Sequence, residues 1–224
     1  SNAAAVAASP NPINFGYFGG GSPGNKSTVN RIDYSNDTAD AIVKGSLSAA
    51  RSYLAATGNS FFGYFAGGDS PAKSTVDRID YGNDTATASP KGPLDIGMRI
   101  LAATGNASFG YFGSGVPGSA ISSISRIDYS NDTATASPKG PLSSAKYKLA
   151  ATGNASFGYF GGGPSLSTVD RIDYSNDTAT AVAKGPLSVA RQFSSATGNS
   201  DFGYFGGGYA SSNVSTVDRV DYSN

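Results

Sequence analysis

The sequence predicts an all-β protein, a single β-propeller of five blades over residues 1–224, and three observations support this fold class. The motif FGYF recurs five times, and so does RIDY (RVDY in the last copy). The period is about 47 residues, which is typical of four-stranded propeller blades. Gly, Pro, Asn and Asp interrupt every segment, so no stretch has the apolar periodicity of a packed helix.

Each repeat divides into four short segments that favour strands, which we call a to d in chain order. In the fourth copy these segments lie at 146–154, 156–163, 167–176 and 178–188, each rich in β-branched, aromatic or small residues and bounded by turn residues. Residues 1–3 have the look of a cloning remnant. The predicted blades are 3–48, 49–95, 96–143, 144–188 and 189–224.

The first and last blades need separate treatment, because strand d is present in only four copies. The last blade is therefore predicted to have three strands. The N-terminal segment 4–14 aligns without a gap to KLAATGNAS when both are anchored on FGYF, so it can serve as strand a of the first blade. The same segment also resembles the sequence TAVAKGP of strand d, so it could instead complete the fifth blade as its outermost strand. We favour strand a, because a missing innermost strand would expose apolar edges on both of its neighbours.

The composition excludes several chemistries. The chain has no Cys, His, Trp or Glu, and its formal net charge is zero. Thiolate nucleophiles, Ser-His-Asp triads and ordinary zinc sites are thereby excluded. Neutral charge speaks against a strongly basic nucleic-acid binder, and no apolar run is long enough to cross a bilayer. We expect a soluble protein without cofactor, metal, nucleic-acid partner or membrane insertion.

Length variation is confined to one loop of the repeat, between strands b and c. The five loops are 22–26, 69–73, 116–121, 164–166 and 209–214, and their lengths account for every difference between repeats. A variable loop on a constant unit is how repeat scaffolds present a binding face, although drift in an unpacked surface loop is an equal alternative. The predicted partner, protein or glycan, binds at this face.

Charged residues recur at two places in the repeat. In strand c, an Arg and an Asp two residues apart lie on the same face of the strand. Because buried charges need partners, we predict that these residues form ion pairs that join adjacent blades. These residues are Arg31, Asp33, Arg78, Asp80, Arg126, Asp128, Arg171, Asp173, Arg219 and Asp221. The connection from strand d to the next strand a carries further cations, which strand parity places at the same end as the b–c loops. They form a candidate ring for an anionic glycan, or else are plain solvated residues: Lys44, Lys91, Lys139, Lys184, Arg51, Lys146 and Arg191.

Other motifs have simpler explanations. The Tyr of FGYF could stack on sugars but more readily packs between blades. The segment DYSNDT loosely resembles the start of a calcium loop but lacks the later ligands, which favours a c–d turn. An enzyme of the sugar-processing kind would need polar residues unique to one blade, and only Asp40, Asp69, Asp95, Asp201 and Gln192 qualify.

The repeat also resembles known families. A Gly pair after strand b, then STVDRIDY, then a basic residue after PLSxA, is similar to the kelch repeat of β-propellers, except that no Trp stands in strand d. The repeat sequence from FGYFGGG to LAATGN is closely similar to tandem repeats encoded by marine bacteriophages of cyanobacteria. These resemblances imply a non-enzymatic structural or recognition propeller of a virion or host-adhesion apparatus, in contact with other virion proteins. A multivalent lectin-like module and a sugar-processing enzyme are the alternatives.

Overall fold

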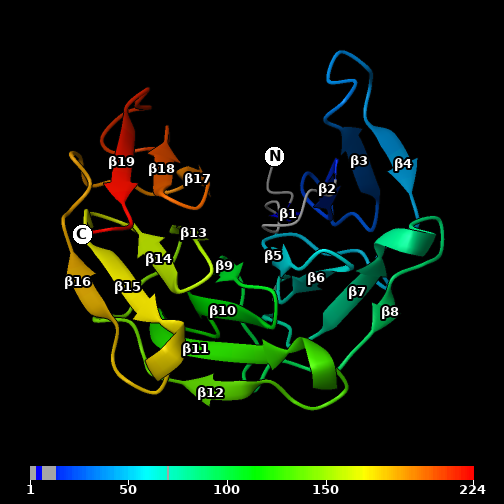
Figure 1. Cartoon of the computed structure of the whole chain (residues 1–224), viewed down its shortest axis with the longest axis horizontal. Helices are drawn as coiled ribbons and strands as arrows, with labels where there is room; N and C mark the ends of the chain where they lie inside the picture. Colours follow the sequence, from blue (N-terminus) through cyan, green and yellow to red (C-terminus); the bar gives the residue numbers. More distant parts are fainter. Residues whose placement is uncertain (1–3, 7–13, 70) are drawn as a thin grey trace.

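The computed structural model describes residues 4–6, 14–69 and 71–224, and these residues form five small antiparallel sheets arranged in a ring (Figure 1). Four sheets have four strands and the last has three, as the repeat predicts. Each of the four-stranded sheets has its four strands in chain order, so every connection joins neighbours. The cloning remnant predicted at 1–3 lies outside the described residues.

Within each blade the strand nearest the axis comes first in the chain. The first two blades contain β1 (Ala4–Val6), β2 (Phe15–Gly19), β3 (Val29–Asp33), β4 (Ile42–Lys44), β5 (Ala55–Gly58), β6 (Phe62–Ala66), β7 (Val76–Asp80) and β8 (Ser89–Pro90). The next two contain β9 (Ala102–Gly105), β10 (Phe109–Gly115), β11 (Ile121–Asp128), β12 (Ser137–Lys139), β13 (Ala150–Gly153), β14 (Phe157–Gly161), β15 (Val169–Asp173) and β16 (Val182–Lys184). The fifth contains β17 (Ser195–Gly198), β18 (Phe202–Gly206) and β19 (Val217–Asp221).

Short 3-10 turns follow strand c in three blades, at Tyr81–Asn83, Tyr129–Asn131 and Tyr174–Asn176. Each begins with the Asp of RIDY, whose side chain accepts a hydrogen bond from the backbone N–H two residues later. This local bond explains why an Asp stands at that position in every copy. The c–d turn expected from DYSNDT is therefore formed by these residues.

The N-terminal strand occupies the innermost place in the first blade, as favoured from the sequence. Strand β1 pairs with β2 in the register Ala4 opposite Gly19 and Val6 opposite Tyr17. In the second blade Ala55 stands opposite Ala66, so Ala4 takes the place that the gapless alignment gives to Ala8. The alignment is therefore wrong by four residues at the start of the chain, although the strand assignment is confirmed.

The hydrophobic core lies between blades rather than inside a separate layer. Four clusters of buried residues each join one blade to the next, and each contains the Tyr of one FGYF motif and the second Phe of the following one. Tyr64 and Phe112, for example, are both 0% exposed and belong to the cluster between the second and third blades. Alternation of bulk with Gly along strand b allows this close packing, because a Phe ring lies directly against Gly19, Gly113 and Gly161 of the preceding blade.

Candidate functional site

Three of the cations predicted to form a surface ring are buried. Arg51, Lys146 and Arg191 are 1–2% exposed. Their ion pairs are Arg51 with Asp77 at 2.6 Å, Lys146 with Asp170 at 2.8 Å and Arg191 with Asp218 at 2.8 Å. Arg51 also donates to the backbone carbonyls of Gly67 and Thr75. The prediction that these three side chains face solvent in a ring is therefore wrong. They connect the segment before strand a to strands b and c of the same blade.

The lysines of strand d are also engaged. Lys44, Lys91 and Lys139 each contact an Asp of the next blade, at 3.1–3.4 Å, with only 12–13% of the side chain exposed. Lys184 is half-buried and has no ion pair within the described part of the chain. No ring of free cations therefore forms at the positions predicted for an anionic glycan.

The strand c arginines do join blades, but through a different carboxylate from the one expected. Each pairs at 2.7 Å with the Asp of the NDT turn in the following blade: Arg31 with Asp84, Arg78 with Asp132 and Arg126 with Asp177. Arg171 instead donates to the backbone carbonyl of Asn224 at 3.5 Å, and Arg219 lies over the Phe202 ring. The predicted partners are taken up locally: Asp33, Asp80, Asp128, Asp173 and Asp221 accept hydrogen bonds from their own turns.

The NDT aspartates of the second, third and fourth blades, Asp84, Asp132 and Asp177, are each the centre of an inter-blade cluster. Asp84 accepts a hydrogen bond from the Tyr17 hydroxyl at 2.9 Å and contacts both Arg31 and Lys44. Burial by itself would raise the pKa of this carboxyl, but the Tyr17 hydrogen bond and the two cations lower it below its ordinary value. Burial and the adjacent carboxylate together raise the pKa of Tyr17 to about 12. The cluster therefore holds a charged Asp and a neutral Tyr at neutral pH, and it joins the first blade to the second.

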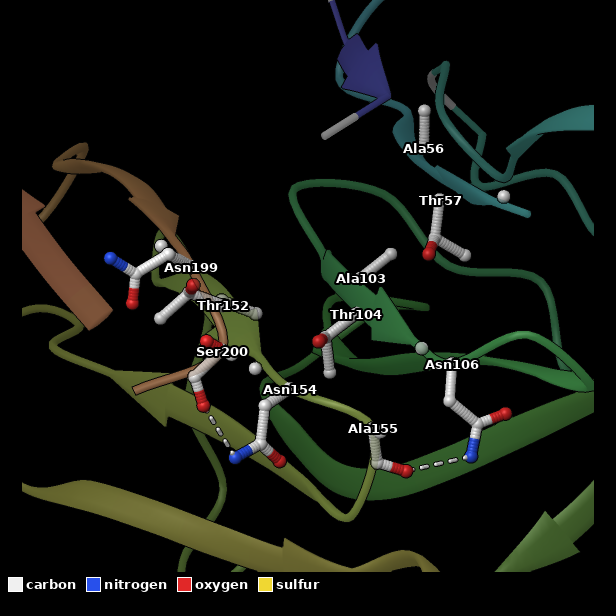
Figure 2. A pocket seen from close by; sticks show the side chains of 15 residues that line it. Ala56, Thr57, Ala103, Thr104, Asn106, Thr152, Asn154, Ala155, Asn199 and Ser200 are labelled. Carbon is white, nitrogen blue, oxygen red and sulfur yellow. Dashed lines mark hydrogen bonds between the residues drawn. The ribbon is translucent and has the colours of Figure 1, made fainter. Parts of the chain in front are cut away.

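The axis of the ring holds a cavity of about 450 Å³, lined by the second half of the inner strands and the a–b turns (Figure 2). Its polar side chains are mostly committed to blade packing. Asn106 donates to the Ala155 carbonyl at 3.3 Å and Asn154 to the Ser200 carbonyl at 3.2 Å, each across to the next blade (Figure 2). The Thr104 hydroxyl bonds the Tyr174 hydroxyl. No ionisable side chain lines this cavity among the described residues.

At the other end of the inner strands lies a second feature, which sequence reasoning missed. Four residues there, one in each of the last four blades, have left-handed backbone with φ of 57–59° and are not Gly. Each amide of the later three donates to the carbonyl of the previous member, at 2.8–3.2 Å. We call this hydrogen-bonded set the axial rim: Tyr53, Ile100, Lys148 and Phe193. Left-handed backbone costs free energy in non-Gly residues, most of all in a β-branched one such as Ile100.

The axial rim carries side chains that differ from blade to blade, in contrast to the repeated residues elsewhere. Phe193 is 49% exposed, and the Lys148 ammonium lies 4.7 Å from its ring centre and 5.2 Å from that of Tyr147. Tyr209 of the last b–c loop is 43% exposed and forms a backbone bridge with Gln192, next to the rim. An aromatic and cationic surface of this kind can bind a planar or hydroxylated ligand face.

The variable b–c loops lie at the same end as the axial rim. Backbone bridges join Lys26 to Arg51, Lys73 to Met98 and Ile121 to Lys146, which places each loop beside a d–a connection. Variable loops and variable rim residues are thus gathered at one end of the propeller, as strand parity predicts. A sequence signal for the rim existed, since the two residues after the buried cation position differ in every copy.

The residues unique to one blade do not meet in one place. Asp69 lies in a b–c loop and accepts a hydrogen bond from Asn25, whereas Asp201 lies in the a–b turn of the fifth blade at the other end of the inner strands. Asp95 accepts a hydrogen bond from Ser125. No cluster of three acidic residues able to hold a metal ion occurs in the described ranges. None of the helices in the described part of the chain has the length and apolar character needed to cross a membrane.

Comparison with models of known protein families and with curated proteins found no match for this chain. The likeness to kelch repeats and to phage repeats therefore stays at the level of the quoted motifs. The fold itself, a five-bladed β-propeller with a three-stranded last blade, follows from the strand pairing.

Proposed function

We propose that this chain is a non-enzymatic recognition propeller, of kelch-like type, that acts in a phage particle and binds its partner at the end formed by the axial rim and the b–c loops. The observation that carries the proposal is the placement of variation. The residues that recur in every copy are engaged between or within blades, whereas the loops of variable length and the variable residues of the axial rim lie together at one end. Selection for binding explains such a pattern better than selection for folding alone.

The kind of partner follows from the chemistry of that end. Phe193 and Tyr209 are exposed aromatic side chains, with the Lys148 ammonium over the Phe193 ring. Aromatic faces with an adjacent cation suit a protein segment or the apolar face of a sugar. The absence of ionisable groups around the axial cavity supports binding rather than catalysis there.

A binding assay with matched variants tests this function. Purified protein is incubated with intact cyanobacterial cells and with a glycan array, and bound protein is quantified. The double substitution Phe193→Ala and Tyr209→Ala should abolish most of the binding. The control is Phe61→Ala, which removes a more exposed ring, 66% accessible, from an a–b turn at the opposite end. Equal binding by both variants would contradict the assignment, and mass spectrometry of purified virions tests whether the chain belongs to the particle.

A lectin-like function with one sugar site per blade is the second candidate. It predicts that glycan binding is retained in the Phe193→Ala and Tyr209→Ala variant, because the other blades would keep their sites. The neutral Thr and Asn groups near the axis favour it, since such groups bond to sugar hydroxyls.

A further inference from the structure

Consecutive blades are joined by one recurring kind of interface. The first and fifth blades each have one outer face that carries half of this interface without a partner among the described residues. In Figure 1 these two blades stand apart, on either side of an opening in the ring. Across the described ranges, no hydrogen bond, ion pair or ring contact joins residues 14–45 to residues 195–224. Three components recur in the internal interfaces, although Ala66 replaces the Gly between the second and third blades and Arg171 contacts the Asn224 carbonyl in place of an Asp between the fourth and fifth. All three components are found unpaired at this opening.

The first component is a stacked tyrosine pair. In every internal interface the strand b Tyr of one blade stacks on the Tyr that ends strand c of the next, with ring centres 4.6–4.8 Å apart. Tyr204 of the fifth blade and Tyr34 of the first have no such partner among the described residues. Tyr34 is 51% exposed, whereas its equivalents Tyr129 and Tyr174 are 9% exposed.

The second component is a Phe ring packed over a Gly of the preceding blade. Phe65 covers Gly19, Phe160 covers Gly113 and Phe205 covers Gly161. At the opening, Gly206 is covered by no ring, since a Cβ built there would meet only Val217 of its own blade. The matching ring is Phe18, which is half-buried while its counterparts are 0% exposed.

The third component is the Arg–Asp pair together with a buried valine. Arg219 on the fifth blade and Asp37 on the first are both exposed, and neither forms an ion pair with any described residue. Val217 is 63% exposed, but Val29, Val76 and Val169 at the same position are 0% exposed. The fifth-blade face therefore offers a cation, an apolar side chain and an uncovered Gly, and the first-blade face offers an anion and two aromatic rings.

We propose that these faces bind each other between copies of this chain, head to tail, with the first blade of one copy docked on the fifth blade of the next. The occupant is a second copy because each face is complementary to the other, component by component, and because the same contacts recur inside the chain: the tyrosine stack in four interfaces, the Phe–Gly contact and the Arg–Asp pair in three each. Such an interface is heterologous, so it joins different patches on the two partners and propagates beyond a dimer unless the rotation closes it. Exposed apolar residues and opposite charges on the two faces both favour the contact.

Variants that block one face each provide the test. Tyr34→Arg blocks the first-blade face and Val217→Arg blocks the fifth-blade face, and both residues are exposed, so the fold should survive. In sedimentation velocity over a concentration series, the unaltered protein should form dimers and larger species. Each blocked variant alone should remain monomeric, whereas an equimolar mixture of the two should form a heterodimer and nothing larger. The control Phe61→Arg, on the second blade, should associate like the unaltered protein.

A charge exchange separates the proposed pairing from general stickiness. Asp37→Arg or Arg219→Asp alone should weaken association by about tenfold. Both substitutions in one chain should restore it, because the reversed charges again meet across the interface. Three outcomes would overturn the proposal: a monomer up to the solubility limit, association of either blocked variant with itself, or failure of the double exchange to recover binding. Circular dichroism of each variant confirms that it is folded.

Discussion

Replacing Arg51 by Met should destabilise the protein by about 3–5 kcal/mol, because it leaves the Asp77 carboxylate buried without its cation. Both side chains are at most 2% exposed, and the Arg51 guanidinium lies 2.6 Å from an Asp77 oxygen. A backbone amide, that of Ser48, still donates to Asp77 at 3.3 Å, which is too weak a contact to replace the ion pair.

The third blade shows how the same site is satisfied without the ion pair. Met98 and Ser125 occupy the positions of Arg51 and Asp77, and both are 0% exposed. The Ser125 hydroxyl donates to Asp95, whereas in the fourth blade Ser143 donates to Asp170, so the hydroxyl and carboxylate have exchanged places. The double variant Arg51→Met and Asp77→Ser matches the third blade at these two positions, while Ser48 stays where that blade has Asp95, and it should lie within about 1–2 kcal/mol of the unaltered protein.

Urea denaturation of the two single variants and the double variant measures this coupling. The carbonyls of Gly67 and Thr75 lose a donor in both variants that lack Arg51, so this loss cancels in the cycle. We expect an interaction free energy of at least about 2 kcal/mol. Lys73→Met, which removes an exposed cation near the same blade end, is the control and should change stability by less than about 0.5 kcal/mol. Additive effects of the two substitutions would refute the buried-pair explanation.

Three further predictions use the same interfaces. Gly92→Ala should cost more than about 2 kcal/mol in chemical denaturation, because its Cβ would lie 1.9 Å from the Ala134 carbonyl oxygen of the next blade; Gly185→Ala, at the equivalent position with nothing within 4 Å, should be neutral. The thermal midpoint should fall as pH rises from 10 toward 12, because the raised pKa of Tyr17 keeps this residue neutral in the folded protein while it ionises in the unfolded chain. The midpoint should also fall below about pH 4, because Asp84 and Asp177, whose pKa values are lowered in the folded protein, lose their stabilising contacts when they become protonated. Deleting residues 1–6 removes β1 and should lower the thermal midpoint by several degrees, and an unchanged midpoint would show that β1 is dispensable.

The fold was predictable because the same structural signals recur in every copy of the repeat. Period, turn residues and the alternation of strand b all point to the same blade, and the three-stranded last blade follows from counting segments. The start of the chain was less certain, because Ala4–Val6 lacks the TGN turn that fixes strand a elsewhere, which allowed the four-residue error in register.

The partners of the charged residues could not be found from alternation alone. Period two places Arg78 and Asp80 on one face, but the blade-to-blade offset brings Asp132 to Arg78 instead. The burial of Arg51 was also not predicted, because this residue lies in a connection between strands, where a charged side chain is expected to face solvent. Comparison of the copies held the missing signal, because cation and carboxylate disappear together in the third blade. Comparison of the copies also marks the position of the axial rim by its variation, but its left-handed backbone was not predictable, since Tyr, Ile, Lys and Phe do not suggest that conformation.

The four hydrophobic clusters of the described residues each belong to a pair of adjacent blades, and this affects how stability is distributed along the chain. An array of such units is stabilised by a sum of nearest-neighbour interfaces, so the second, third and fourth blades each gain from two interfaces and the outer blades from one. Strand exposure follows this rule: Ala55 and Ala150 are 7% exposed, whereas Ser195, their equivalent in the fifth blade, is exposed. Docking a second copy on the fifth blade would bury this strand in the way that β13 is buried, and would add a fifth interface without any new kind of contact. The proposed recognition at the rim and the proposed assembly through the end faces would use different surfaces of the same blades, so substitutions in one need not disturb the other.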